Sequence, residues 1–437
     1  MLLKFSIENF RSIGERQILD LVPKREQNHR GHIADRPTAK ALKVAGIYGA
    51  NASGKSNLVS AIGVMETIVR ISATQLNVGD PITPIVPFRL DASWDQQPTR
   101  FETVCAFGGK TYRYGFSATN KRIVEEWLHV AEGSGTERPW IERRMNSDGT
   151  MGVDLNGPLR DELTRRILAD HTRENGLALS RGAEFNVESL SPLYLWFREN
   201  VWFRDLSKST DVLTLHTAER MQGDDVFAKR VVDLMYDADV GISDITIHDQ
   251  KRPTPDVPFG APPEVKHIVE RLETVFGDNR VNRHRVLTKH VRPDGRAVHF
   301  DLEDDESNGT RRLFSLCSFI LAALDDGDVL VLDELDCSLH PRLTRKIVEL
   351  FLSETHNRSG AQLIFTSHDT SLFDSKLFRR DQLWLAEKDE RGQSLYSALS
   401  DFDDPPRKNE ALAKRYLEGR YGGVPNFGPE LDSLLVE

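Results

Sequence analysis

The feature that most constrains this chain is the stretch Gly-Ala-Asn-Ala-Ser-Gly-Lys-Ser at residues 49–56, which fits the pattern G-x-x-x-x-G-K-[ST] at every position. The apolar residues 42–48 before it predict a buried strand, and residues 55–71 predict an amphipathic helix. Glycines in such a loop let successive backbone N–H groups curl around a phosphate at the start of the helix. The sequence therefore predicts an α/β fold with a phosphate-binding loop. Its candidate residues are Gly49, Ala50, Asn51, Ala52, Ser53, Gly54, Lys55, Ser56 and Asn57.

Two side chains of this loop have a specific expected chemistry. Lys55 is expected to reach the β- and γ-phosphates of a nucleotide, and the Ser56 hydroxyl is expected to ligate Mg²⁺. The alternative is an ordinary glycine turn with an exposed lysine. The strand before the loop and the helix after it favour the nucleotide site.

A second candidate lies at residues 329–334, Val-Leu-Val-Leu-Asp-Glu, where four apolar residues are followed by two carboxylates. Asp333, at the end of the expected strand, could hold Mg²⁺ directly or through water. The adjacent Glu334 is suited to polarise the water that attacks the γ-phosphate. Alone, such a strand end is often simply solvated. Together with the phosphate loop, it predicts the second half of a nucleotide site.

Composition excludes several classes of protein. The chain has 437 residues, of which 39% are apolar and 28% charged, as is typical of globular proteins of two to three domains. A formal net charge of −10 argues against a histone-like coat of positive charge. The three cysteines are scattered, the N-terminal residues lack an apolar core of signal-peptide length, and no stretch is long enough to cross a bilayer. We therefore expect a cytoplasmic protein without a membrane segment.

The spacing of the two motifs limits which kinds of P-loop protein this chain can be. Lys55 and Asp333 are about 280 residues apart, much farther than in compact P-loop enzymes. A GTPase should also carry Asn-Lys-x-Asp for guanine, whereas the similar string at residues 120–123 ends in Ile. Alternating residues at 99–132, with two short turn signals, predict an antiparallel meander inside this interval.

Three further stretches complete the pattern. Residues 306–312, Glu-Ser-Asn-Gly-Thr-Arg-Arg, open an apolar helix, where Ser307 and the nearby glycine could form either an anion site or a plain helix cap. An apolar strand is expected at residues 363–366 and leads to His368. An acidic turn with Asp336 follows the pair of carboxylates.

This order of motifs, together with Asn-Phe-Arg-Ser at residues 9–12, resembles the ATP-binding cassette (ABC) ATPases, specifically their SMC- and RecF-like branch. The resemblance implies a nucleotide-contacting signature motif, a D-loop and a switch histidine at Ser307-Asn308-Gly309-Thr310, Asp336 and His368, respectively. The signature departs from Leu-Ser-Gly-Gly-Gln, because Asn308 replaces the first glycine and Thr310 the glutamine.

Two strings narrow the resemblance further, ESNGTRRLF at residues 306–314 and RYLEGRYGGVP at residues 415–425. Both strings resemble those of stand-alone bacterial AAA-type ATPases related to the OLD ATPases. Such stand-alone ATPases are often encoded beside a nuclease or other effector in anti-phage systems such as PARIS and Septu. The resemblance implies ATP and Mg²⁺ as cofactors and hydrolysis by Glu334 and His368. It also implies a homodimer or higher oligomer that sandwiches ATP between two subunits, and a nuclease or toxin as protein partner.

The expected fold class is therefore an α/β, ABC-type P-loop ATPase head with an antiparallel β subdomain and a largely helical insertion. Residues 1–150 and 296–437 would form the head, and residues 151–295 would form the mainly helical insertion or lid.

Alternatives remain open at this point. A RecF-like repair ATPase would bind DNA, and the basic residues 280–296 could follow a nucleic-acid backbone or form a hairpin face balanced by the acidic residues 301–306. A transporter ATPase subunit is disfavoured by the degenerate signature. Four aromatic residues could form either the core of a helical subdomain or a docking patch: Trp196, Phe197, Trp202 and Phe203.

Overall fold

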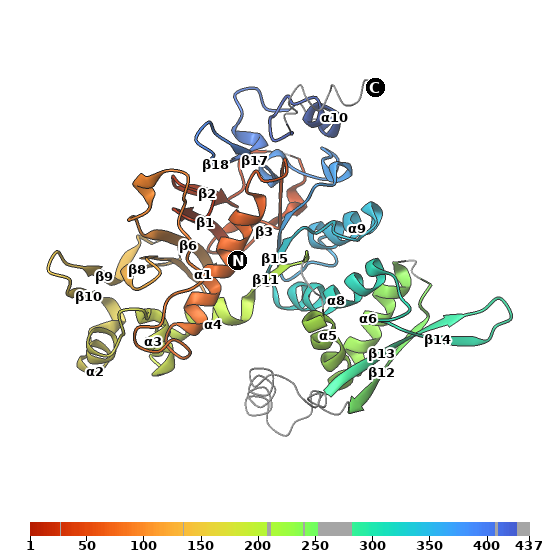
Figure 1. The fold of residues 1–437 in the computed structure, drawn as a ribbon, viewed down its shortest axis with the longest axis horizontal. Helices are drawn as coiled ribbons and strands as arrows, with labels where there is room; N and C mark the ends of the chain where they lie inside the picture. The colour runs from red at the N-terminus through yellow and green to blue at the C-terminus, as the bar shows by residue number, and fades with distance from the viewer. Residues whose placement is uncertain are drawn as a thin grey trace, which may run out of the picture. The chain divides into compact units, whose positions relative to one another are not determined.

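The chain, seen in a computed structural model, forms two compact units that are described one at a time (Figure 1). The structure describes residues 1–26, 28–133, 135–207, 211–238, 241–251, 282–406 and 410–425. The first unit comprises residues 1–207, 322–337 and 341–437, and the second comprises residues 208–321 and 338–340.

A six-stranded sheet in the first unit joins strands from distant parts of the chain. In spatial order these are β11 (Val201–Asp205), β15 (Val329–Asp333), β16 (Gln362–Thr366), β5 (Val44–Gly49), β17 (Leu383–Lys388) and β18 (Ser394–Ala398). The first five are parallel, and β18 is antiparallel to β17. Every residue of β5, β15 and β16 is buried, which explains their continuous apolar sequences. The carboxyl ends of the parallel strands therefore share one edge of the sheet.

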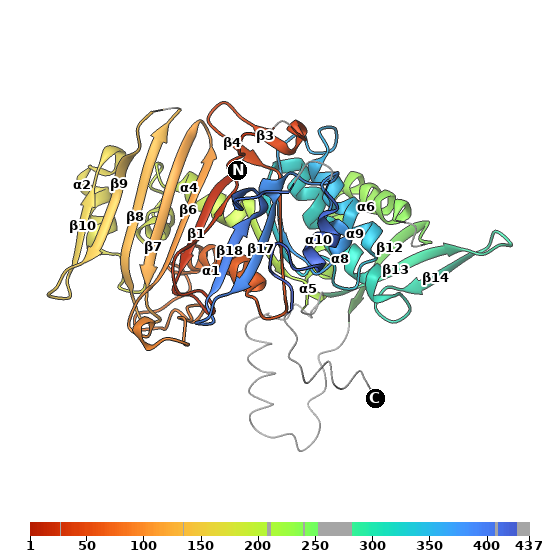
Figure 2. The ribbon, with the colours of Figure 1, turned by 90° about the horizontal axis from the view of Figure 1, so that it is seen from above.

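The first unit also contains a seven-stranded antiparallel sheet, whose strands lie side by side in Figure 2. In spatial order these are β10 (Met151–Leu155), β9 (Arg138–Met145), β8 (Ile123–Glu132), β7 (Lys110–Ala118), β6 (Thr99–Phe107), β1 (Leu2–Glu8) and β2 (Gln17–Asp20). The meander predicted at residues 99–132 is present as β6, β7 and β8. Along β6, buried residues alternate with half-buried ones, as expected when one face of a sheet covers a core.

Helix α1 (Lys55–Ile71) joins the two sheets into one core. It contacts β11 and β15 of the parallel sheet and β1 of the antiparallel sheet, and its apolar side chains belong to one buried cluster with residues of both. At Gly63, an added Cβ would lie 2.5 Å from the Phe203 ring, so this glycine allows α1 and β11 to approach closely. Helix α9 (Pro341–Leu352) packs against β16 and β5.

A buried carboxylate fixes the segment that follows β10. Glu126 accepts hydrogen bonds from the N–H groups of Ala178 and Leu179 at 2.7 and 3.0 Å and pairs with Arg143 at 3.2 Å. It thereby satisfies amides at the start of α3 (Ala178–Glu184), which have no partner within the helix. Through these contacts residues 151–207, expected in the insertion, belong to the first unit, together with α2 (Glu162–Arg165) and α4 (Ser191–Asn200).

The aromatic cluster at residues 196–203 also belongs to the first unit. Trp196 and Phe197 lie on α4 and are buried in the core shared with α1. Trp202 and Phe203 lie on β11, where the Trp202 indole donates a hydrogen bond to Asp328 at 3.0 Å. The cluster is therefore not the core of a separate helical subdomain.

The second unit combines helices with a small antiparallel sheet. Its elements are α5 (Asp211–Gly223), α6 (Asp225–Asp237), β12 (Asp244–Lys251), β13 (Asn282–Val291), β14 (Ala297–Asp301) and the first part of α8 (Asn308–Asp326). The Thr217 hydroxyl on α5 bonds to Ser318 on α8 at 2.9 Å. The predicted α/β class is confirmed, and the insertion contains a sheet besides its helices. No helix within the described residues is long and apolar enough to cross a bilayer.

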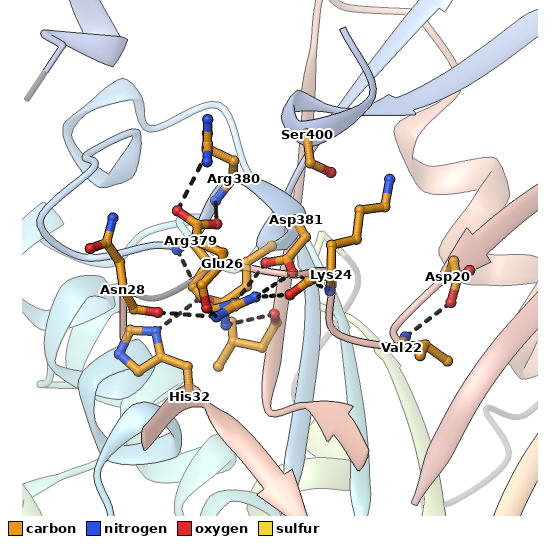
Figure 3. A network of polar contacts seen from close by, with 12 residues as sticks. Asp20, Val22, Lys24, Glu26, Asn28, His32, Arg379, Arg380, Asp381 and Ser400 are labelled. Atoms are coloured by element: carbon orange, nitrogen blue, oxygen red, sulfur yellow. Dashed lines mark hydrogen bonds and ion pairs between the residues drawn. The ribbon is translucent and has the colours of Figure 1, made fainter. Parts of the chain in front are cut away.

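A buried ion pair ties the N-terminal loop before β3 (Ile33–Asp35) and β4 (Lys40–Leu42) to the residues before β17 (Figure 3). The guanidinium of Arg379, which is fully buried, bonds to both carboxylate oxygens of Asp381 at 2.6 and 2.8 Å. It also donates to the carbonyl oxygens of Lys24 and Asn28, both at 3.0 Å. Asp381 in turn accepts the Lys24 N–H at 2.9 Å. Burial of both charges is tolerated because each is paired and hydrogen-bonded.

Arg379→Met is therefore expected to lower the free energy of unfolding by roughly 3–5 kcal/mol, because Asp381 would stay buried without its charge partner. Urea denaturation would measure this loss. The matched control is Lys4→Met, which breaks the solvent-exposed pair with Asp20 at 2.9 Å and should cost less than about 1 kcal/mol. Equal losses in the two variants would contradict the role of the buried pair.

His32 is expected to make the stability of the fold depend on pH. Its Nδ1 lies 3.0 Å from Gln382 Oε1, and burial lowers its pKa from 6.5 to about 4. The unfolded chain therefore takes up a proton near pH 6.5, whereas the folded chain does so only near pH 4. Stability should fall as pH falls through this window and level off below it.

His32→Asn is expected to make this loss of stability shallower, because asparagine does not titrate. Thermal unfolding of both proteins at intervals from pH 7 to 4 would measure the difference. Parallel pH profiles for the two proteins would show that His32 is not responsible.

Candidate nucleotide-binding site

The phosphate loop links β5 directly to α1, as predicted. The loop needs left-handed backbone at Ala52 and Gly54, whose φ angles are +62° and +102°. A Cβ added at Gly54 would lie 2.1 Å from Ser394 Oγ, so only glycine fits there. Because α1 begins at Lys55, the amides of Lys55 and Ser56 have no acceptor within the helix and can bind an anion.

The side chain of Lys55 folds back onto the phosphate loop. The residue is only 6% exposed, and its ammonium donates to the carbonyl oxygens of Gly49 and Ala50 at 2.8 and 2.9 Å. Burial lowers the pKa of Lys55 to about 8, against the opposing effect of Asp333 and other nearby carboxylates. The cation is thus held at the mouth of the loop, where phosphate oxygens would approach the amides.

Asp333 ends β15 beside the phosphate loop. Its Oδ1 accepts a hydrogen bond from the Thr366 hydroxyl at 2.6 Å. Burial raises the pKa of Asp333, while the Thr366 and Ser56 hydroxyls and the Lys55 ammonium act in the opposite direction. The two residues predicted to hold Mg²⁺, Ser56 and Asp333, therefore lie near each other.

Glu334 has left-handed backbone with φ +58°, which turns the chain sharply after β15. Its N–H donates to the Thr366 hydroxyl at 2.8 Å, and its carbonyl accepts the Cys337 N–H at 2.9 Å. Thr366 thus connects Asp333 and Glu334. The sequence placed Thr366 at a strand end but gave it no role, because the contact depends on the pairing of β15 with β16.

Asp336 and His368 also meet at this edge. The backbone N–H of His368 donates to the two carboxylate oxygens of Asp336 at 3.2 and 3.3 Å. The His368 side chain remains exposed. Partial burial lowers its pKa, assisted by the charge of Lys55 and opposed by the carboxylates of Asp336, Glu334 and Asp333. The imidazole is therefore neutral at neutral pH and can donate one hydrogen bond.

Asp205 is an acidic residue of this edge that the sequence analysis missed. It ends β11 and pairs in register with Asp333 on the neighbouring parallel strand. Its charge contributes to the raised pKa of Asp333. The available signal was Val-Trp-Phe-Arg-Asp at residues 201–205, an apolar run that ends in a carboxylate, as residues 329–333 do.

The predicted signature residues belong to the second unit. The Ser307 hydroxyl accepts the Thr310 N–H at 3.1 Å and lies 2.8 Å from the Thr310 hydroxyl. A Cβ added at Gly309 would lie 2.8 Å from the Ser338 carbonyl oxygen, so glycine permits a close backbone approach. Ser307 therefore caps α8, and any contact of Ser307, Gly309 and Thr310 with a nucleotide remains a prediction.

One protein family matches the chain across most of its length. The family described as "AAA domain, putative AbiEii toxin, Type IV TA system" matches residues 44–374. The chain belongs to this AAA-domain family. The match begins at β5 and extends past His368, so it contains the phosphate loop and the carboxylates of β15. No curated protein matches this AAA domain significantly.

Solved structures show a more distant likeness to this AAA domain. An Smc head bound to the C-winged helix domain of ScpA is 12% identical, with 91% of this chain and 97% of that chain covered and a TM-score of 0.38. The recombination mediator RecF, titled RecF-ATPrS in the RecFOR pathway, is 16% identical, with coverage of 91% and 98% and a TM-score of 0.35. An Smc head with a coiled coil and joint from Pyrococcus yayanosii is 12% identical, with coverage of 96% and 99% and a TM-score of 0.35.

The residues of the AAA domain fit a nucleotide with Mg²⁺. The buried Ser53 hydroxyl has no hydrogen-bond partner among the described residues, as expected for a loop that wraps a phosphate. In that same part of the chain, no three His, Cys, Asp or Glu side chains form a metal cage. Mg²⁺ commonly binds one or two carboxylates plus phosphate oxygens and water. Ser56 and Asp333 therefore suit a metal that arrives with its nucleotide.

Thr366→Val would remove the hydroxyl that joins Asp333 to Glu334 and keep nearly the same shape. We expect kcat for ATP hydrolysis to fall about tenfold, because the Asp333 carboxylate loses a hydrogen-bond donor and the Glu334 N–H loses its acceptor. KM should change little, since the hydrogen bonds of the Thr366 hydroxyl go to Asp333 and Glu334. Steady-state kinetics would measure both values, with Thr366→Ser as the control that keeps the hydroxyl. Unchanged kcat in the valine variant would contradict this positioning role.

Proposed function

We propose that the chain is an ATPase that uses bound ATP as a switch for assembly with itself and with a protein effector. The proposal rests on one observation above all. Ser56 and Lys55 of the phosphate loop lie close enough to Asp333 of β15 to act against the rise in its pKa, so two halves of the site that are about 280 residues apart in sequence lie together. This proximity supports the joint placement of phosphates, metal and attacking water at one sheet edge.

The side chains at this edge divide the reaction among them. The Lys55 ammonium exchanges a loop carbonyl for phosphate oxygens, and the helix amides bind the remaining phosphate charge. Ser56 and Asp333 would hold Mg²⁺, which would neutralise charge on the transferred phosphate. Glu334 accepts the proton of the attacking water. The neutral His368 donates a hydrogen bond to the γ-phosphate.

Assembly would follow from a shared site. In a two-fold dimer, Ser307, Gly309 and Thr310 of the partner subunit would contact the γ-phosphate, and Asp336 would lie at the interface, giving two composite sites. Hydrolysis removes the γ-phosphate and with it the contact between subunits. ATP would thus close the assembly, and its hydrolysis would open it.

A toxin or nuclease is the proposed effector, and the cytoplasm is the proposed location. The family description applies the words putative toxin to the AAA-domain family itself, so the support for a separate effector is the resemblance to ATPases of anti-phage systems. An ATPase that controls such an effector would need the assembly switch described above.

DNA binding of the RecF kind has less support. In the described part of the basic segment 280–296, Arg285 pairs with Asp301 at 2.7 Å and His290 contacts Glu306 at 2.7 Å. Residues 280 and 281 lie outside the described residues. These local partners favour a balanced hairpin face over a groove for a phosphate backbone.

Glu334→Gln is expected to bind ATP but to hydrolyse it at least about 100-fold more slowly, because the amide cannot accept the water proton. ATP should then accumulate in the shared sites and hold a dimer of twice the monomer mass. Mass photometry with and without ATP, together with phosphate release, would measure both effects.

Lys55→Ala is the matched control for this experiment. It should bind ATP poorly and remain monomeric at the same nucleotide concentration. If Glu334→Gln hydrolyses ATP at the wild-type rate, the catalytic assignment is wrong. If it stalls hydrolysis without assembling, the ATPase stands but the assembly switch does not.

A further inference from the structure

A glycine turn near the C-terminus lies against the first residue of the phosphate loop. This terminal glycine turn, residues 419–424, follows helix α10 (Leu412–Leu417), drawn in dark blue in Figure 1. Gly419, Gly422 and Gly423 have φ angles of +77°, +71° and +68°. A residue with a Cβ is strained in this left-handed region, so the path of the turn depends on its glycines.

Gly49 lies next to both this turn and strand β17. A Cβ added at Gly423 would lie 3.6 Å from Gly49 Cα and 3.5 Å from Leu385 Cδ2. A Cβ added at Gly49 would lie 2.4 Å from the Ala386 carbonyl oxygen. The first residue of the phosphate loop is thus close to both β17 and the terminal glycine turn.

Two polar contacts hold the turn in this place. The Gly423 N–H donates to the Glu387 carboxylate, and the Tyr416 hydroxyl donates to the Gly423 carbonyl oxygen at 2.9 Å. A Cβ added at Gly422 would lie 1.4 Å from Glu387 Oε1, so alanine there must displace the carboxylate that binds the next residue.

Aromatic packing completes a closed path from the turn back to the loop. The ring centroids of Tyr416 and Phe373 are 4.9 Å apart, and those of Phe373 and Tyr48 are 5.0 Å apart. Tyr48 is fully buried and immediately precedes Gly49. The turn therefore lies beside Gly49 and is also connected to it through this stack of rings.

We propose that the terminal glycine turn is a positioning element of the nucleotide site, so that the affinity for ATP depends on Tyr416, Gly422 and Glu387. Lys55 bonds to the carbonyl oxygens of Gly49 and Ala50, and a displaced Gly49 would move the cation away from the phosphates. The proposal rests on the proposed function, because it requires the loop to bind ATP. The three residues are positioning residues that act through Gly49.

The test compares variants of the turn with matched controls. Tyr416→Phe removes one hydrogen bond to the turn, whereas Tyr421→Phe removes one from the same segment to Glu410, 3.0 Å away. Gly422→Ala strains the turn against Glu387, whereas Gly149→Ala imposes the same kind of strain at φ +84° with no neighbour within 4 Å. Titration with a fluorescent ATP analogue gives Kd, steady-state hydrolysis gives KM and kcat, and thermal unfolding without nucleotide gives stability.

Tyr416→Phe should weaken ATP binding about fivefold, as for the loss of one hydrogen bond, and Gly422→Ala should weaken it about tenfold or more. Their KM should rise in parallel while kcat at saturating ATP stays near the wild-type value, because Glu334 and His368 are untouched. The controls Tyr421→Phe and Gly149→Ala should bind ATP as the wild type does.

Wild-type Kd and KM in both turn variants would overturn the proposal, even if the variants unfold at lower temperature. Equally weak ATP binding in the two control variants would overturn the proposal too, since the effect would then not be specific to the terminal glycine turn. A wild-type protein that binds no ATP, or a Lys55→Ala variant that binds it unchanged, would instead remove the proposed function on which this inference rests.

Discussion

The parallel register of β15, β16 and β5 is the constraint on which the rest of the site depends. Leu332 pairs with Phe365, and Thr366 pairs with Ile47, so Asp333 and Thr366 end their strands side by side, while β5 continues two residues further to Gly49. In a strand, a shift of one residue turns every side chain to the opposite face. Such a slip would carry the Asp333 carboxylate away from Ser56 and break its hydrogen bond with the Thr366 hydroxyl.

Local signals in the sequence explain which parts could be predicted. The loop, the helix from Lys55 to Ile71 and the strand at residues 329–333 are each specified by neighbouring residues, and all are present. The local signal for strand β11 is weaker, because only its first three residues are apolar and they follow α4 directly. Its five residues form a strand by pairing with β15. The roles of Thr366 and Asp205 were hidden for the same reason, since both depend on strands distant in sequence.

The start of α8 shows a different limit of sequence reasoning. A serine before a helix can cap it or bind an anion, and both uses call for the same residue types. The structure shows the cap, in which Ser307 accepts the Thr310 N–H. A capping hydroxyl still leaves amides at the helix start that no intrahelical carbonyl reaches. Only a bound nucleotide can therefore separate the two uses.

Electrostatics link the strained edge of the sheet to its ligand. Asp205 and Asp333 end neighbouring strands in register, and the charge of Asp205 adds to burial in raising the pKa of Asp333. Two carboxylates so placed repel each other in the protein alone, and the left-handed backbone of Glu334 adds about 1 kcal/mol of strain. A divalent cation attracts both carboxylates and so offsets this repulsion. Binding of Mg²⁺ with nucleotide at this edge would therefore stabilise the first unit.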